Sequence, residues 1–180
     1  MPSHVALLRG INVGKGNQIA MSDLRALLAG LGFADVSTYL RSGNALFSST
    51  EDDRDALAAR IEQAIADELG MAIRCVVRLR DDLVRVVGAN PFASVATDPA
   101  RLVVTFLSQP PDPARLADID PAGHAPERFH VGEEEIYLWY PNGMRDAKLT
   151  HAFFEKRLGG GVAATARNWN TVTKLLDLMR

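Results

Sequence analysis

The chain has 180 residues, of which 47% are hydrophobic and 23% charged, and its formal net charge at pH 7 is −2. This length suits one good-sized domain or two small ones, and the composition is that of a globular protein rather than a disordered one. The apolar runs are of strand length, far short of the ~20 residues of a bilayer span, so no membrane partner is expected.

In the first half, hydrophobic periodicity and turn residues predict a β-α-β-β-α-β-α order. The expected elements are a strand at 4–11, a helix at about 22–31, strands at 36–41 and 45–48, a helix at 53–69, a strand at 73–79 and a short helix at 82–88. Gly43-Asn44 is interpreted as a two-residue hairpin loop between the second and third strands.

The second half repeats this order without repeating the sequence. The expected elements are a strand at 102–107, a short helix at 113–119, strands at 128–131 and 136–140, a helix at 150–158, a strand at 162–165 and a helix from 169. The glutamates at 133–135 would lie in a solvated turn. We therefore expect an α+β protein of two tandem ferredoxin-like (β-α-β-β-α-β) sandwiches, 1–90 and 91–180, each with an additional helix.

The single cysteine, Cys75, lies within an apolar run, which favours a core residue over a nucleophile. One cysteine cannot form a disulfide within the chain, and the N-terminus lacks the pattern of a secretory signal. The sequence therefore predicts a cytoplasmic protein.

Two polar runs, 9–12 and 41–44, each follow an apolar strand and share arginine, glycine and asparagine. In a split β-α-β unit the first two strands run parallel, with the third inserted antiparallel between them. The two runs should therefore meet at one edge of the sheet.

The segment from Gly10 to Asn17, between a strand and a helix, has the layout of a loop whose N–H groups bind a phosphate. It lacks the Walker pattern and a Gly-x-Gly-x-x-Gly sequence, so nucleotide hydrolysis is not predicted. A flexible glycine connection explains the same residues, and hairpin chemistry explains Gly43-Asn44. Ser42 has no assigned base, so no catalytic residue is predicted.

A third run, 165–171, precedes the last predicted helix. Thr165 or Asn168 would cap this helix, and its N–H groups with Arg167 would form a second anion pocket. The four histidines show no metal-ligand spacing, so we predict neither a metal nor a cofactor.

The segments 7–14, 38–44, 90–92 and 165–172 resemble the signatures of domain-of-unknown-function family 1697. The resemblance implies a bacterial-type cytoplasmic protein of two ferredoxin-like subdomains and brings no established activity. The chain departs from the usual pattern at Gly14-Lys15-Gly16-Asn17, where the family has Gly-Gly-Lys-Asn, and at Arg41, where glutamine is usual. The resemblance and the motifs together give these candidate ligand-binding residues: Arg9, Asn12, Gly14, Ser42, Gly43, Asn44, Arg167, Asn168, Trp169 and Asn170.

Three functions fit these residues, and whether the protein is an enzyme stays open. The first is binding of a small anionic ligand that bears phosphate or carboxylate groups. Local charge favours it, since residues 1–48 hold four Lys/Arg against two Asp/Glu and residues 144–180 hold seven against three. The second is nucleic-acid binding, which the net charge of −2 disfavours. The third is structural, with the polar runs holding the two subdomains together. The oligomeric state is open as well.

Overall fold

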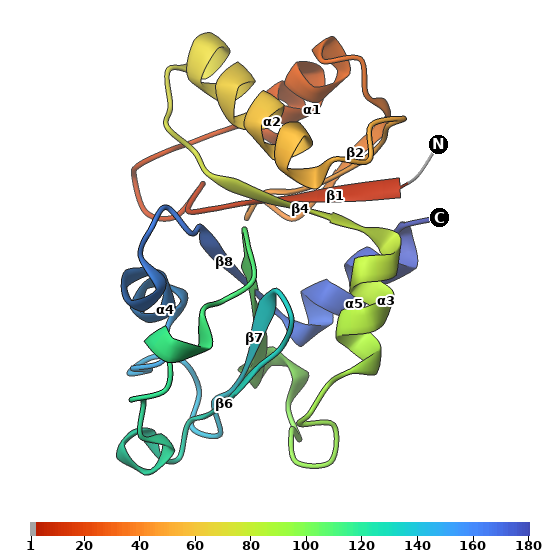
Figure 1. Ribbon diagram of the computed structural model, residues 1–180. Helices are drawn as coiled ribbons and strands as arrows, with labels where there is room; N and C mark the ends of the chain where they lie inside the picture. The colour runs from red at the N-terminus through yellow and green to blue at the C-terminus, as the bar shows by residue number, and fades with distance from the viewer. Residues whose placement is uncertain (1–2) are drawn as a thin grey trace. The chain divides into compact units, whose positions relative to one another are not determined.

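The computed structural model describes residues 3–180 and contains, within them, two four-stranded antiparallel sheets and five α-helices (Figure 1). Packing divides the chain into unit 1, which runs to Val84 and includes Leu175–Arg180, and unit 2, Arg85–Lys174. The sequence places the boundary at 90/91, whereas the observed division falls within α3 (Arg80–Gly88) and within α5 (Trp169–Leu178).

The sheet of unit 1 has the strand order β2-β3-β1-β4, and all neighbours are antiparallel. Its strands are β1 (Ser3–Leu8), β2 (Ala34–Tyr39), β3 (Asn44–Ser48) and β4 (Cys75–Leu79). Because β3 pairs antiparallel with both β1 and β2, these two strands run parallel to each other. The strand order predicted for the first half is thus confirmed.

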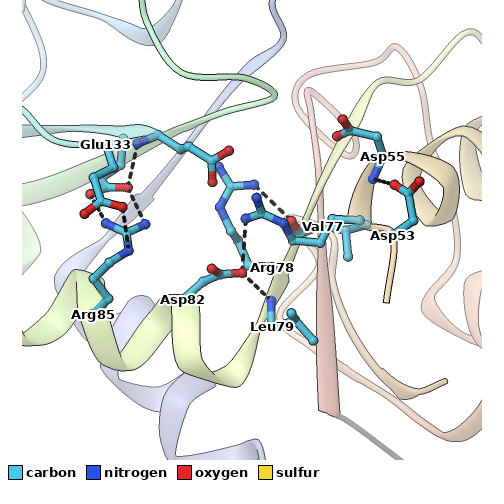
Figure 2. A network of polar contacts seen from close by, with 11 residues as sticks. Asp53, Asp55, Val77, Arg78, Leu79, Asp82, Arg85 and Glu133 are labelled. Carbon is cyan, nitrogen blue, oxygen red and sulfur yellow. Dashed lines mark hydrogen bonds and ion pairs between the residues drawn. The ribbon is translucent and has the colours of Figure 1, made fainter. Parts of the chain in front are cut away.

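Two helices, α1 (Met21–Gly30) and α2 (Arg54–Leu69), lie on one face of this sheet (Figure 1). Their apolar stripes share one core with alternate residues of the strands, a core that includes Leu24, Leu28, Leu57, Ile61, Ala6, Leu8, Phe47 and Val77. The carboxylate of Asp53 caps α2 by accepting from the N–H groups of Asp55 and Ala56, both at 3.0 Å (Figure 2).

The Asp82 carboxylate fixes the start of α3. It accepts from the N–H of Leu79 at 2.8 Å and from the guanidinium of Arg54 at 3.2 Å, so it ties α3 to α2 (Figure 2). The side chain of Arg80 donates to the carbonyl of Met179 at 3.1 Å, which holds the C-terminal residues within unit 1.

Several predicted boundaries in unit 1 are wrong. The strands expected at 36–41 and 73–79 are β2, Ala34–Tyr39, and β4, Cys75–Leu79. The first strand ends at Leu8 rather than 11, because Gly10 has a left-handed φ of 65° that ends the extended backbone. The β2–β3 connection is not the two-residue loop Gly43-Asn44. Tyr39 pairs directly with Asn44, so Asn44 belongs to β3 and the turn has four residues, 40–43.

The sheet of unit 2 has the order β6-β7-β5-β8 and is also antiparallel throughout. Its strands are β5 (Leu102–Leu107), β6 (Arg128–Val131), β7 (Glu135–Trp139) and β8 (Ala164–Asn168). Helix α4 (His151–Leu158), capped by the Thr150 hydroxyl, packs on this sheet through Phe154 and Leu158.

The α-helix predicted at 113–119 is wrong. That segment holds a single 3-10 turn, η2 (Pro113–Arg115), followed by another, η3 (Pro121–His124); a third such turn, η1 (Pro99–Arg101), precedes β5. Leu116 and Ile119 are buried in the core of unit 2, so their spacing reflects packing rather than a helical period. The last strand also lies two residues later than predicted, which places Arg167 and Asn168 in β8.

The interpretation of the glutamate run as a solvated turn is wrong for Glu135. Its side chain is 1% exposed and forms a bidentate ion pair with Arg85 at 2.8 and 3.1 Å. A buried carboxylate requires a charged partner, and Arg85 supplies it. Glu133 remains exposed and lies 3.4 Å from the Nε of Arg85 (Figure 2).

Cys75 is 2% exposed, and its Sγ lies 3.6 Å from the carbonyl oxygen of Ala58. Burial raises the pKa of the thiol, the nearby charge of Glu62 raises it further, and Arg74 opposes both. Because the thiolate is the reactive species, we expect the folded protein to resist iodoacetamide at about pH 8 and to be alkylated once guanidinium unfolds it. Mass spectrometry of the two samples measures this, and stoichiometric labelling of the native protein would contradict it.

Candidate functional site

The segment between β1 and α1 turns sharply because four of its residues have left-handed backbone angles. These are Gly10, Asn12, Gly14 and Asn17, with φ values of 65°, 55°, 63° and 51°. Glycine and asparagine are the residues that adopt this region most readily. The N–H of Asn12 donates to the carbonyl of Asn17 at 3.1 Å and closes the loop on itself.

The side chain of Asn12 connects this loop to the β2–β3 turn. Its Nδ2 donates to the carbonyls of Arg41 at 2.7 Å and Ile19 at 2.9 Å, while its Oδ1 accepts from the N–H of Ile19 at 2.9 Å. The two polar runs, 29 residues apart in sequence, therefore meet. Their predicted convergence at one edge of the sheet is confirmed.

The buried side chain of Asn44 fixes the β2–β3 turn. It is fully buried, and its Nδ2 donates to the carbonyl of Tyr39 at 2.8 Å and to the hydroxyl of Ser42 at 3.2 Å. Since both amide hydrogens have acceptors and the side chain has no exposed surface, Asn44 positions the turn rather than offering a group to a ligand.

Gly43 is needed for its missing side chain. Its φ is 91°, and an added Cβ would lie 2.8 Å from the Cδ1 of Ile11 and 2.9 Å from the Cβ of Leu8. The carbonyl of Gly43 accepts from the N–H of Leu8 at 2.9 Å, which keeps the turn against the end of β1.

Gln18 orients the loop, although it is not among the candidate residues predicted from the sequence. Its Nε2 donates to the carbonyls of Gly14 at 2.9 Å and Gly16 at 3.3 Å. In the part of the chain that the structure describes, the N–H groups of residues 13–15 have no acceptor. These residues are exposed, so the loop fixes its own carbonyls and keeps a short run of N–H groups without a partner.

Two cationic side chains flank these donors. Lys15 and Arg41 are exposed, and neither side chain has a hydrogen bond or ion pair among residues 3–180. The neighbouring apolar side chains of Val13 and Leu40 are 72% and 52% exposed, and Leu40 has a left-handed φ of 61°. Arg9 is half-buried at the end of β1, and its N–H donates to the carbonyl of Arg74 at 2.9 Å.

The Arg167 segment lies in unit 2. Arg167 is 8% exposed, and its guanidinium donates to the hydroxyl of Thr165 at 2.9 Å and the carbonyl of Ala166 at 2.8 Å. Burial lowers the pKa of Arg167 to about 10, so the side chain remains charged at neutral pH.

Helix α5 begins directly after β8, and Asn168 caps it. The Oδ1 of Asn168 accepts from the N–H of Thr171 at 3.0 Å, so Asn168 rather than Thr165 is the cap. Trp169 is half-buried and Asn170 is exposed in the first turn. No group of three His, Cys, Asp or Glu side chains that could hold a metal occurs among the described residues.

A family model described as "Protein of unknown function (DUF1697)" matches residues 1–137. The chain belongs to this family. The resemblance seen in the sequence motifs is therefore confirmed, and the matched part of this DUF1697 protein contains both loops of unit 1.

The structure is also similar to that of the conserved bacterial protein SP0830 from Streptococcus pneumoniae. The two share 22% sequence identity over 99% of each chain, with a TM-score of 0.73, so the likeness shows a common fold. No curated protein matches the chain. Among residues 3–180, every helix is too short or too polar to cross a bilayer.

Replacing Gly43 with alanine is expected to destabilise the protein by more than ~2 kcal/mol, because the new Cβ overlaps Ile11 and Leu8 at an unfavourable φ. The matched control is Gly14→Ala, where φ is 63° and, among residues 3–180, no atom beyond the two chain neighbours lies within 4 Å of the added Cβ. Only the cost of a left-handed alanine backbone, ~1 kcal/mol, applies there. Urea unfolding of both variants measures the difference, and equal losses would show that the close packing of Gly43 does not matter.

Replacing Asn12 with alanine is expected to cost ~2–4 kcal/mol, since three hydrogen bonds are lost and alanine is strained at a φ of 55°. Asn12→Gly removes the same bonds without the backbone strain, so the gap between the two variants isolates the strain at ~1 kcal/mol. The free energy of unfolding measures both. A glycine variant as stable as wild type would contradict the role given to the amide.

Proposed function

We propose that this DUF1697 protein binds a small anionic ligand, bearing phosphate or carboxylate, at the loop pair of unit 1, defined as residues 9–18 and 40–43. One observation carries the proposal: the N–H groups of residues 13–15 have no acceptor among the described residues, although the loop itself is held by side-chain hydrogen bonds. Successive backbone N–H groups in a turn that contains left-handed residues can form an anion-binding concavity.

The charges next to the loop favour the same ligand. Lys15 lies within the run of donors, and Arg41 adjoins it through the bond between its own carbonyl and Asn12. A hydrogen bond between a charged partner and an N–H contributes about 1.5–3 kcal/mol, more than a neutral one. A ligand should therefore gain the most binding free energy when it places an ionised group between the N–H donors and the two cations.

The amide side chains act as supports in this site. Asn12, Gln18 and Asn44 use their amide N–H groups on backbone carbonyls or on Ser42, so the loop pair is ordered before any ligand arrives. A binding loop ordered in advance loses less conformational entropy when the ligand binds. Asn12, Gly43 and Asn44 thus serve the site by shaping it, while backbone N–H groups, Lys15 and Arg41 contact the ligand.

We further propose that both units are ferredoxin-like and that the protein acts in a bacterial cytoplasm. The strand orders β2-β3-β1-β4 and β6-β7-β5-β8 support the first point, since each places the third strand of its unit beside the first. The free, buried thiol of Cys75 and the likeness to a bacterial protein support the second.

Titration of the ¹⁵N-labelled protein with inorganic phosphate, sulfate and adenosine monophosphate tests the site. We expect amide shifts at residues 13–15, and we expect Lys15→Gln with Arg41→Gln to weaken binding at least ~10-fold at unchanged melting temperature. Lys174→Gln, an exposed cation on α5, is the control and should bind like wild type.

Absence of shifts at residues 13–15 with all three anions would reject the proposal. Shifts of unchanged size in the Lys15→Gln/Arg41→Gln variant would mean that the N–H donors bind the anion and that the two cations do not contribute. Tighter binding of single-stranded oligonucleotides than of any small anion, with steep salt dependence, would favour a nucleic-acid partner instead.

A further inference from the structure

Unit 2 contains a pocket of about 290 Å³ that no sequence motif indicated. It lies between the segment that runs from η3 into β6 and the loop that joins β7 to α4. Pockets that take small molecules begin at ~300 Å³, so this one suits a compact ligand rather than a dinucleotide.

The pocket has a fixed frame. The Glu127 carboxylate accepts from the N–H groups of Lys148 and Leu149, both at 2.9 Å, and so fastens the β7–α4 loop to the start of β6. Tyr140, which also lines the pocket, is 1% exposed and donates its hydroxyl to the carbonyl of Leu149 at 2.5 Å. Burial and the charge of Glu127 raise the pKa of Tyr140, which keeps this hydroxyl a donor.

Four polar side chains of the lining are available to a ligand. Asn142, Arg145, Asp146 and Lys148 are exposed, and within residues 3–180 their side chains have neither a hydrogen bond nor an ion pair. The carboxylate of Glu127 is already occupied by two N–H groups. The available charges are thus two cations and one carboxylate, in the same small pocket.

His124, which lines the pocket, contains a buried polar atom. The Nδ1 of His124 is buried and has no hydrogen-bond partner among the described residues, while its ring packs edge-on against Phe153 with centroids 5.7 Å apart. A buried polar atom without a partner is uncommon in a folded protein and marks this wall of the pocket as more polar than packing requires.

We infer that this pocket binds a phosphorylated sugar or similar small phosphorylated polyol. Arg145 and Lys148 hold the phosphate, because a guanidinium and an ammonium complement its charge and its acceptor oxygens. Asp146 and Asn142 bind hydroxyl groups, one as acceptor and the other as donor and acceptor. The proline rings of Pro126 and Pro141, which also line the pocket, suit the apolar face of a sugar.

Ribose 5-phosphate is the test ligand, with ribose and inorganic phosphate as its two halves, titrated into the full-length chain by calorimetry and ¹⁵N NMR. We expect shifts within residues 124–148 that show binding of ribose 5-phosphate at least ~10-fold tighter than of either half. Arg145→Gln with Lys148→Gln should abolish these shifts. Asp146→Asn should weaken ribose 5-phosphate and leave inorganic phosphate unchanged.

Two controls separate this pocket from the loop pair of unit 1. Lys156→Gln, an exposed cation on α4 outside the pocket, should bind like wild type, and the shifts within residues 124–148 should be unchanged in Lys15→Gln with Arg41→Gln. No response within residues 124–148 up to about 10 mM ligand would overturn the inference. So would shifts within residues 124–148 that survive loss of Arg145 and Lys148, or shifts there that give equal affinities for inorganic phosphate and ribose 5-phosphate.

Discussion

The Asn12 carboxamide is the interaction on which the loop pair of unit 1 depends. Its three hydrogen bonds use both the donor and the acceptor of one side chain and join the loop after β1, the entry to α1 and the β2–β3 turn. Asparagine suits this position twice over, since it adopts a φ of 55° more readily than other residues with a side chain and its amide reaches two carbonyls. A residue that met only one of these requirements would leave either the backbone strained or the turn detached.

This arrangement separates shaping from binding. Leu40, Asn12 and Asn17 hold left-handed backbone angles that cost free energy in residues other than glycine, and such strain persists only where surrounding bonds enforce it. In unit 1 the enforcing bonds come from Asn12, Gln18 and Asn44 and end on groups of the loops or of the residues next to them, such as Tyr39. The N–H groups of residues 13–15 have no acceptor in this network.

The sequence predicts these features where local chemistry decides them. The helix expected at 53–69 agrees with α2, which Asp53 caps and Gly70 ends with a φ of 66°, and right-handed crossover rules place β3 between β1 and β2. The sequence does not predict features that depend on a residue far along the chain. Glu135 is buried because it pairs with Arg85, 50 residues away, and Leu116 and Ile119 have a helix-like spacing because both pack into the core of unit 2. Nothing in the sequence distinguishes Gln18, because its role depends on the directions of the Gly14 and Gly16 carbonyl groups in the folded loop.

The two proposed sites recognise negative charge by different physical means. In unit 1 the donors are backbone N–H groups, whose directions are set by the fold and which survive most side-chain substitutions. In unit 2 the cations of Arg145 and Lys148 sit on a loop fastened by Glu127, so recognition there rests on side chains that a single substitution removes. Screening by salt weakens the exposed cations of both sites, Lys15 and Arg41 at the loop pair and Arg145 and Lys148 in the pocket, more than directional N–H groups. Affinity at the loop pair should therefore keep a part that high ionic strength does not remove, which is the part contributed by the N–H groups of the loop.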